Sequence, residues 1–197
     1  DAPTMSHYHR TIDENSVTGA TVGKVCTGSD EDNGDTLSYA ITDGNTDSVF
    51  QIDSSTAQIS VALDDMLDYE GDQREWNLTI TVTDDGVGGQ FDPLSTTGKV
   101  TIAVANVNEA PEITKDQSFA VYENASSGHS VGMIVSSDPD NNRIADTQSL
   151  VYEDLSSDQV QERFYIRSDG GVRVAGSLDY ESAQSYILNF SVTDNGS

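Results

Sequence analysis

The chain has 197 residues, of which 34 are acidic and 9 are basic, so its formal net charge is −25. A surface with this charge repels nucleic acid phosphates and anionic lipid headgroups, so we expect neither class of partner. No apolar run approaches the ~20 residues of a membrane-spanning helix, so we expect no direct membrane insertion by this segment. Self-repulsion among the carboxylates destabilises a folded chain unless cations offset it.

The periodicity of the first half is that of β strands. Residues 50–52 and 59–61 predict a hairpin around the polar turn at 53–56. Apolar and polar residues then alternate over 76–83 and again over 97–104, which is typical of half-buried strands. We find no sustained helical period of 3.6 residues.

The second half repeats most of this pattern. Residues 164–166 and 172–174 flank a glycine-containing turn, and 186–193 alternates as 76–83 does. We find no counterpart of 97–104, so we expect an open sheet edge that reflects either truncation or a strand supplied by a neighbour. Short strands separated by turns predict an all-β chain of two tandem Greek-key β-sandwich domains with immunoglobulin-like topology, joined end to end.

Acidic residues recur at the same interval as the strands. The motif Leu-Asp-Tyr-Glu occupies 67–70 and again 178–181, roughly 110 positions later. Three further signatures recur at nearly this interval: Glu14 with Glu123, Asp30 and Asp32 with Asp138 and Asp140, and Asp84 with Asp194. We therefore predict two repeats, 1–107 and 108–197, each near the usual size of a domain. A surface adapted to high salt is the alternative, but it does not explain acids at fixed positions.

The two predicted repeats meet at a short polar stretch, 106–111, which ends in Pro111. Proline stiffens a linker of this kind. The first three residues, Asp1, Ala2 and Pro3, are similar to the end of this stretch. We therefore expect the segment to begin just after another repeat.

The recurring carboxylates suit calcium, a hard cation that takes about 6–8 oxygen ligands. Neither acidic run fits an EF-hand loop. The run from Asp30 has Asp35 where the sixth-position glycine belongs and Ile41 where the twelfth-position glutamate belongs. The run from Asp138 fails likewise, with Ser149 at the twelfth position. A calcium site would therefore be assembled from separated segments.

The order of these features resembles two consecutive cadherin repeats over nearly the whole chain. The matching features are a Glu-Asn after the first strand, Asp-x-Asp, a Phe-x-Ile hairpin, Leu-Asp-x-Glu, a strand ending in Val-x-Asp, and an Asn-rich linker before proline. The resemblance implies an extracellular, calcium-binding repeat pair of a larger membrane-anchored adhesion glycoprotein, with calcium rigidifying the linker. It also implies other cadherin-like repeats of the same or a neighbouring chain as partners, and no enzymatic activity.

In that family calcium ions lie between successive repeats, and the resemblance implies a set of ligands for this junction. They are Glu14, Asp68 and Glu70 from the first repeat, Asn106, Asn108 and Glu109 from the linker, and Asp138, Asp140 and Asp194 from the second repeat. A backbone carbonyl of Asn141 or Asn142 is a further candidate. The family linker usually reads Asp-x-Asn-Asp-Asn-x-Pro, whereas Asn106 and Glu109 here replace two aspartates and the stretch is one residue shorter. We therefore expect two or three calcium ions.

The same resemblance implies metal half-sites at the outer ends of the two repeats. Asp30, Asp32 and Asp84 would face a junction before this chain, and Glu123, Asp179 and Glu181 would face one after it. Separately, glycosylation sequons make Asn77, Asn124 and Asn189 candidate glycan sites, and a fourth sequon begins at Asn195.

The sequence is also compatible with two other functions. The chain could be a structural repeat of an extracellular fibre or microbial surface stalk that assembles by strand sharing, or an accessory domain of a secreted carbohydrate-active enzyme. Asp68 and Glu70 could imitate a glycosidase pair, but they adjoin each other in an acidic patch.

His7 and His9 could share a strand face and hold zinc, although we expect an ordinary surface pair. Cys26, the only cysteine, is expected to be a small core residue.

Overall fold

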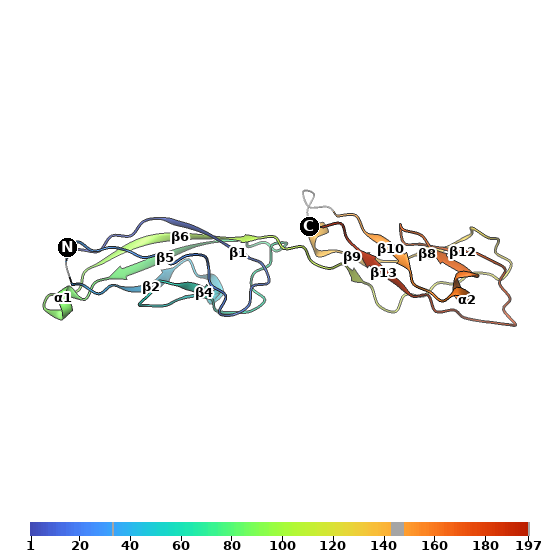
Figure 1. Ribbon diagram of the computed structural model, residues 1–197, viewed down its shortest axis with the longest axis horizontal. Coiled ribbons are helices and arrows are strands. Elements are labelled where there is room, and N and C mark those ends of the chain that lie inside the picture. Colours follow the sequence, from blue (N-terminus) through green and yellow to red (C-terminus); the bar gives the residue numbers. More distant parts are fainter. Residues whose placement is uncertain (33, 143–147, 197) are drawn as a thin grey trace. The chain divides into compact units, whose positions relative to one another are not determined.

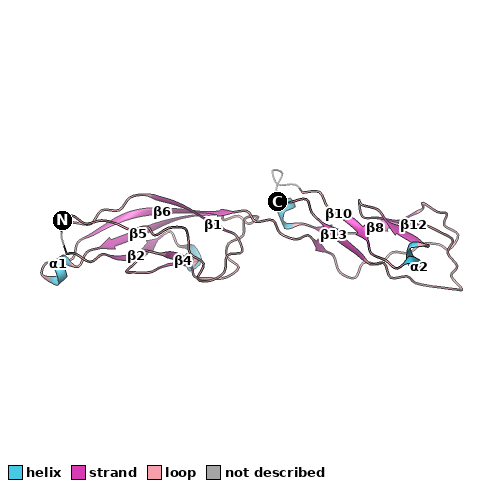
Figure 2. Cartoon of the chain, in the orientation of Figure 1, coloured by secondary structure: helices cyan, strands magenta, loops and turns pink. Residues whose placement is uncertain are grey.

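The computed structural model describes residues 1–32, 34–142 and 148–196. Contacts between Cα atoms divide the chain into two compact units, Asp1–Val107 and Asn108–Ser197. Strands dominate both units, and the helical segments are 3 or 4 residues long (Figure 2). These segments are η1 (Thr46–Ser48), α1 (Gly86–Gly89), η2 (Pro139–Asn142) and α2 (Asp158–Gln161). The predicted all-β fold class is confirmed. Among the described residues, no helix has the length and apolar character needed to cross a membrane.

The larger sheet of the first unit has four strands in the order β1-β6-β5-β2 (Figure 1). They are β1 (Tyr8–Asp13), β2 (Ser38–Asp43), β5 (Glu75–Thr83) and β6 (Ser95–Ala105). Strand β6 pairs antiparallel with β5 over nine positions and parallel with β1 over six. It is therefore an interior strand that is hydrogen-bonded along both edges.

The predicted hairpin at 50–61 is present in the first unit. Strands β3 (Phe50–Ile52) and β4 (Ile59–Val61) pair antiparallel. Asp53 organises the turn between them, because its Oδ1 accepts hydrogen bonds from the N–H groups of Thr56 at 2.8 Å and Ser55 at 3.0 Å. These bonds, together with those from the two hydroxyls, hold the pKa of Asp53 well below its ordinary value.

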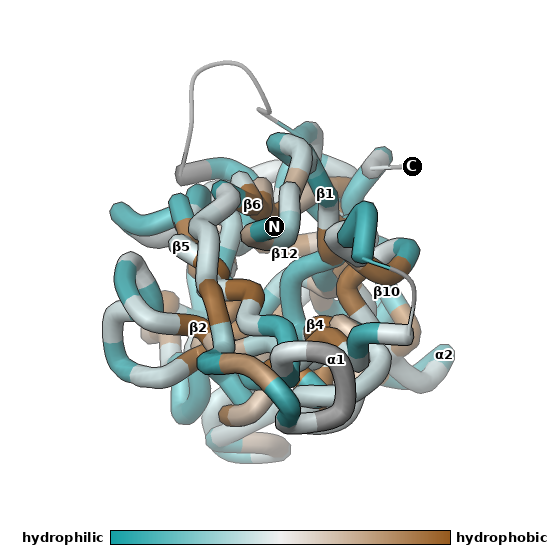
Figure 3. Tube along the Cα trace, turned by 90° about the vertical axis from the view of Figure 1, so that its left-hand side faces the viewer, coloured by the Kyte–Doolittle hydropathy of each residue, from teal (hydrophilic) through white to brown (hydrophobic). Residues whose placement is uncertain are grey.

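The alternating apolar residues of β5 and β6 form the core of the first unit. All are between 0% and 5% exposed: Trp76, Leu78, Ile80, Val82, Val100, Ile102 and Val104. Figure 3, coloured by hydropathy, shows hydrophobic segments in brown among loops that are mostly hydrophilic, in teal. Phe50 of β3 packs edge-on against Trp76, with ring centroids 5.4 Å apart. Cys26 is also buried here, and this burial raises the pKa of its thiol.

The second unit contains shorter strands in three small sheets, ordered β11-β12-β8, β10-β13 and β7-β9. The strands are β7 (Glu112–Ile113), β8 (Ser130–Met133), β9 (Ser136–Ser137), β10 (Val151–Asp154), β11 (Phe164–Ile166), β12 (Gly171–Val174) and β13 (Phe190–Thr193). Strands β11 and β12 form the second predicted hairpin. The buried core cluster is small and comprises Ile134, Ile166 and Val172.

The pair β10-β13 repeats the register of β2-β5. Tyr39 lies opposite Val82 in the first unit, and Tyr152 lies opposite Val192 in the second. The prediction of a strand over 186–193 is nevertheless wrong for its first half, because only β13, Phe190–Thr193, is paired with another strand. The physical reason is the pairing: β5 has hydrogen-bonded strands on both edges, whereas β13 pairs with β10 alone among the described residues.

Candidate metal centres

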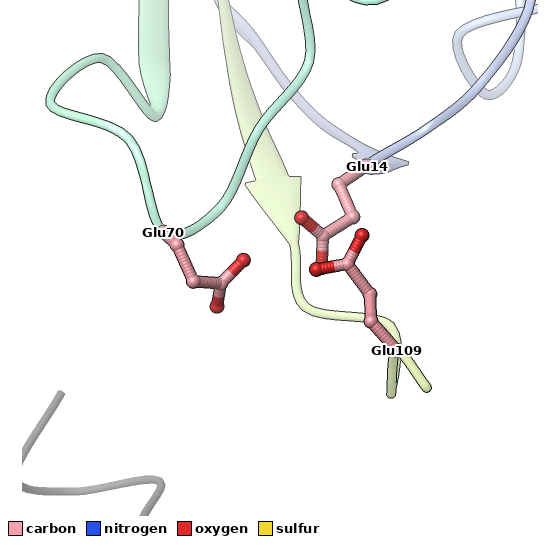
Figure 4. A group of neighbouring side chains, drawn as sticks. All are labelled: Glu14, Glu70 and Glu109. Atoms are coloured by element: carbon pink, nitrogen blue, oxygen red, sulfur yellow. The ribbon is translucent and has the colours of Figure 1, made fainter. Parts of the chain in front are cut away.

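Glu14 and Glu70 bring two carboxylates together at one end of the first unit. Glu14 follows β1 directly and is 3% exposed. Its Oε2 accepts a hydrogen bond from the N–H of Tyr69 at 2.8 Å, and its Oε1 accepts one from the N–H of Val107 at 2.7 Å. A carboxylate oxygen of Glu14 and one of Glu70 lie within 4.8 Å of each other, as the two side chains facing a common space in Figure 4 illustrate. Two acids at this distance repel each other unless a cation lies between them.

Asp68 shapes the loop that presents Glu70. Its Oδ1 accepts hydrogen bonds from the N–H groups of Glu70 and Gly71, both at 3.0 Å. An aspartate that bonds its own backbone in this way fixes a turn. Asp68 itself is exposed, as is Asn106 at the end of β6. In the described structure, Asp68 therefore positions a candidate ligand rather than joining the cluster.

Among the described residues of the second unit, Asp138 and Asp140 are the most deeply buried acids. Asp138 is 4% exposed and Asp140 is fully buried, at 0%. Oδ1 of Asp138 accepts a hydrogen bond from the N–H of Asp140 at 3.0 Å, and Oδ2 of Asp140 accepts one from the N–H of Glu109 at 2.9 Å. The other oxygens, Oδ2 of Asp138 and Oδ1 of Asp140, are buried without a hydrogen-bond partner among the described residues. Such oxygens are costly to bury unless a cation compensates them.

Electrostatics at this pair disfavours the charged state. Burial is the largest cause that raises the pKa of Asp138, and the neighbouring charges of Asp140 and Asp194 raise it further. The hydrogen bond from Asp140 opposes this shift. A divalent cation would reverse the balance by favouring the ionised carboxylates.

Amide side chains of the second unit connect the remaining candidates. Nδ2 of Asn108 donates to Oδ1 of Asp194 at 3.2 Å, and Oδ1 of Asn108 accepts from Nε2 of Gln148 at 2.7 Å. Oδ1 of Asn141 accepts a hydrogen bond from the N–H of Gln148. Glu109, drawn in Figure 4, belongs by its contacts to this second unit. The unit thus gathers the oxygen-bearing side chains of Asn108, Asp138, Asp140 and Asp194.

A second acidic cluster lies within the first unit, around Asp30, Asp35 and Asp84. One carboxylate oxygen from each lies within 4.8 Å of the others. Asp84 is 4% exposed, and its Oδ1 accepts from the N–H groups of Leu94 at 2.9 Å and Gly86 at 3.0 Å. Oδ2 of Asp30 and Oδ2 of Asp84 are buried without a hydrogen-bond partner in the described structure. This cluster therefore has the same chemistry as the pair in the second unit.

Asp35, a member of this cluster, was not among the predicted ligands, which included Asp32. Asp32 lies outside this cluster. Asp35 closes the same acidic run, so the run itself was the available signal. Which of its acids turn inward depends on the loop conformation, which the sequence pattern does not specify.

The third cluster, Glu123, Asp179 and Glu181, lies in the second unit and is exposed. It repeats the geometry of the first unit: Glu123 accepts from the N–H of Tyr180 at 2.9 Å, as Glu14 does from Tyr69. A hydrogen bond from the Ser182 hydroxyl is the main cause that lowers the pKa of Asp179. The three candidate glycan sites, Asn77, Asn124 and Asn189, are also exposed.

Tandem β-sandwich units with buried acids near their ends define a class of extracellular repeat protein, and comparison with known proteins identifies the family. The family description "Cadherin domain" matches residues 8–105 and 117–197. The chain therefore belongs to the cadherin family. The predictions of family, fold and extracellular location are confirmed, since cadherin domains form the extracellular parts of adhesion proteins.

Several relatives are similar over most of this chain. The chain is 36% identical to human cadherin EGF LAG seven-pass G-type receptor 3 over 172 residues, covering 85% of this chain and 5% of that protein. It is 30% identical to mouse protocadherin Fat 4 over 201 aligned residues, covering 96% of this chain and 4% of that protein. Human protocadherin gamma-A9 is 32% identical over 127 residues, covering 62% and 13%. The chain thus spans a small part of each of these proteins.

Solved cadherin structures share the fold. A crystal structure of mouse cadherin-23 EC22-24 superposes with a TM-score of 0.70 at 22% identity, covering 99% of this chain and 61% of that chain. The human desmocollin-1 ectodomain gives a TM-score of 0.62 at 26% identity, covering 99% of this chain and 38% of that chain. Cadherin domains bind calcium at the junctions between repeats. The buried carboxylates of this chain fit that ion, because they are hard oxygen donors.

Proposed function

We propose that this repeat pair binds two or three calcium ions at its linker and that the ions stiffen the linker within a larger adhesion protein. The observation that carries the proposal is the pair of buried carboxylate oxygens, one each on Asp138 and Asp140, that have no hydrogen-bond partner in the described structure. Unmet buried charge of this kind is costly, and a divalent cation removes the cost.

Chain connectivity supports a site shared by the two repeats. Val107 donates its N–H to Glu14, and Glu109 donates its N–H to Asp140. The two donors are two residues apart, a distance that an extended chain spans in at most about 7 Å. Calcium that binds acids on both sides of this stretch would favour the conformations in which they converge. The linker would then lose freedom that it has without calcium.

We expect calcium at the proposed sites to act on the linker rather than on the folding of each unit. Extracellular calcium modules bind with dissociation constants of about 10⁻⁴–10⁻³ M. The corresponding stabilisation is about 0.4–1.4 kcal/mol per site at 1 mM calcium. The first unit has its own extensive core, so we expect it to fold in chelator and calcium to act chiefly on the junction.

The test is small-angle scattering of the 197-residue chain during a calcium titration. We expect the maximum dimension to increase and the interdomain flexibility to fall as calcium is added, and chelator to reverse both. Glu70→Gln and Asp140→Asn should remain flexible at millimolar calcium. Glu153→Gln is the matched control, because Glu153 is an exposed acid of β10 outside the three clusters. A wild-type profile that is the same in calcium and in chelator would refute the proposal.

We further propose that the pair acts through other cadherin-like repeats, of the same or a neighbouring chain, and has no enzymatic activity. Cadherin relatives are adhesion proteins, and the candidate residues serve as oxygen donors in clusters rather than as an acid–base pair. Sedimentation velocity in calcium and in chelator would show whether repeats of separate chains associate. A sedimentation coefficient that rises with protein concentration in calcium but not in chelator, and not in Asp140→Asn, would support this part of the proposal, and one that is independent of protein concentration would count against it.

A further inference from the structure

Two histidines flank Tyr8 at the start of β1, outside the three acidic clusters. The rings of His7 and His9 stack with their centroids 5.3 Å apart and their planes 2° from parallel. Both side chains are exposed. The sequence predicts an ordinary surface pair, whereas this arrangement presents two imidazole rings to the same space. Imidazole nitrogens held side by side are ligands for zinc and copper.

The residue between the two histidines fixes their direction. Tyr8 packs against the core of the first unit, and its hydroxyl donates a hydrogen bond to the carbonyl of Thr27 at 2.7 Å. The guanidinium of Arg10 lies over the Tyr8 ring, 4.8 Å from its centroid. Because successive side chains of a strand point to opposite faces, His7 and His9 project away from the side that Tyr8 occupies. The backbone of β1 is held in turn by parallel pairing with β6 over six positions.

The surroundings of this pair differ from those of the acidic clusters. Strand β1 is an edge strand of its sheet, and His9 lies opposite Thr101 of its neighbour β6. Strand β6 carries no acidic residue, and its one charged side chain, Lys99, is a cation. Calcium prefers a shell of oxygen ligands, which these residues do not offer. Imidazole suits zinc and copper instead, so the pair is selective for a different kind of metal ion.

Coordination of one ion by both rings requires only side-chain rotation. A Zn–N bond is about 2.0–2.1 Å long, so two nitrogens on one ion lie at most about 4.2 Å apart. The ring centroids are 5.3 Å apart, and rotation about the χ angles of the two exposed side chains brings the nitrogens within this limit. The backbone of β1 need not move. Two protein ligands leave further coordination positions open, which water or a donor from a neighbouring molecule can fill.

We infer that His7 and His9 together chelate one divalent transition-metal ion, copper(II) most tightly and zinc more weakly. This order is the one in which nitrogen ligands generally bind the two metals. The net charge of −25 raises the concentration of cations around the chain and so favours loading of the site. The two ligands belong to the first unit and are nitrogen donors, so this site is independent of the calcium proposed at the linker.

The test titrates the 197-residue chain with copper(II) or zinc by calorimetry in about 10 mM calcium, well above the roughly 10⁻⁴–10⁻³ M dissociation constants of extracellular calcium modules. Calcium then competes for the acidic clusters but not for imidazole. His7→Gln and His9→Gln should each weaken binding at least about tenfold, because the second imidazole closes the chelate within the same chain. His129→Gln is the matched control, since His129 is the third histidine of the chain and is exposed in the second unit. Affinity that is unchanged in both β1 variants, or an ion that calcium displaces, would overturn the proposal.

Proton NMR of the imidazole rings identifies the ligands directly. Copper(II) is paramagnetic and broadens the resonances of the rings that bind it. At substoichiometric copper, the Hε1 resonances of His7 and His9 should broaden together while that of His129 stays sharp. Broadening of only one of the two β1 histidines would mean binding through a single ligand and would overturn the proposal. Trp76 is buried in the same unit, so its fluorescence before metal is added reports that the variants remain folded.

Discussion

The carboxylate of Glu14 accepts a 2.8 Å hydrogen bond from the backbone N–H of Tyr69, a residue 55 positions further along the chain. The second unit repeats this relationship between Glu123 and Tyr180 at 2.9 Å. In both units the repeated glutamate therefore closes the loop that carries the Leu-Asp-Tyr-Glu motif. Its carboxylate serves the fold as well as the proposed metal site.

Glu14→Ala should destabilise the first unit even in chelator. The substitution leaves the N–H groups of Tyr69 and Val107 without their acceptor. Losing both bonds at a buried site should cost about 2–4 kcal/mol. Trp76, the only tryptophan of the chain, is 3% exposed in this unit, so denaturant unfolding followed by its fluorescence measures the change.

Asp92→Ala is the control for this measurement, because Asp92 is an exposed acid of the same unit. It should shift the free energy of unfolding by less than about 0.5 kcal/mol. If Glu14→Ala unfolds at the same denaturant concentration as Asp92→Ala in chelator, then the carboxylate of Glu14 has no structural role beyond metal binding.

Asp53→Asn should destabilise the first unit at pH 7 by an amount that becomes smaller in acid. Hydrogen bonds from Thr56 and Ser55 keep the folded-state pKa of Asp53 below its unfolded value. The stabilisation is therefore fully present above the unfolded pKa of about 4 and is lost as pH falls through the folded pKa. Trp76 fluorescence during denaturation at pH 7 and at pH 3 measures the difference between variant and wild type. A difference that grows on acidification would contradict the assignment.

Much of the fold could be predicted from periodicity, because the alternation of apolar and polar residues indicates which side of a strand is buried. The positions of β5, β6 and the two hairpins were predictable for this reason. The parallel pairing of β1 with β6 was not, since strand order is a tertiary property that alternation does not encode. Residues 186–189 alternate as a strand should, but they belong to no strand ladder in the described structure, and the pattern alone could not show that.

The candidate sites were predictable in composition but less so in detail. Repetition and family resemblance singled out Asp138 and Asp140, and the structure shows that they are buried. Asp35 joins Asp30 and Asp84 in the structure, whereas Asp32 was the predicted member of this group. Both residues lie in one acidic loop, where the backbone path decides which side chain turns inward. That Asp68 is a ligand stays a prediction; its Oδ1 accepts two backbone hydrogen bonds of its own turn.

Ile102→Ala should test the role of β6 as the central strand of the first unit. The side chain is fully buried between strands, so its truncation should cost about 2–4 kcal/mol through lost burial and the cavity that remains. Lys99→Ala, at an exposed position on the same strand, should cost less than about 0.5 kcal/mol. Unfolding followed by Trp76 fluorescence compares the two. Equal effects would mean that β6 contributes little to this core.

Asp138→Asn should have opposite effects in chelator and in calcium. In chelator it removes a buried charge that lies beside Asp140 and Asp194, so the second unit should become more stable. The amide oxygen can still accept the hydrogen bond that Oδ1 of Asp138 accepts from Asp140. In millimolar calcium the variant loses a charged ligand and should be less stable than wild type by about 0.5–1.5 kcal/mol. Hydrogen exchange at the β12 amides measures both differences, with Glu153→Gln as the control. A variant that is destabilised equally in chelator and in calcium would show that this carboxylate acts in folding and that the buried oxygen is not a cation ligand.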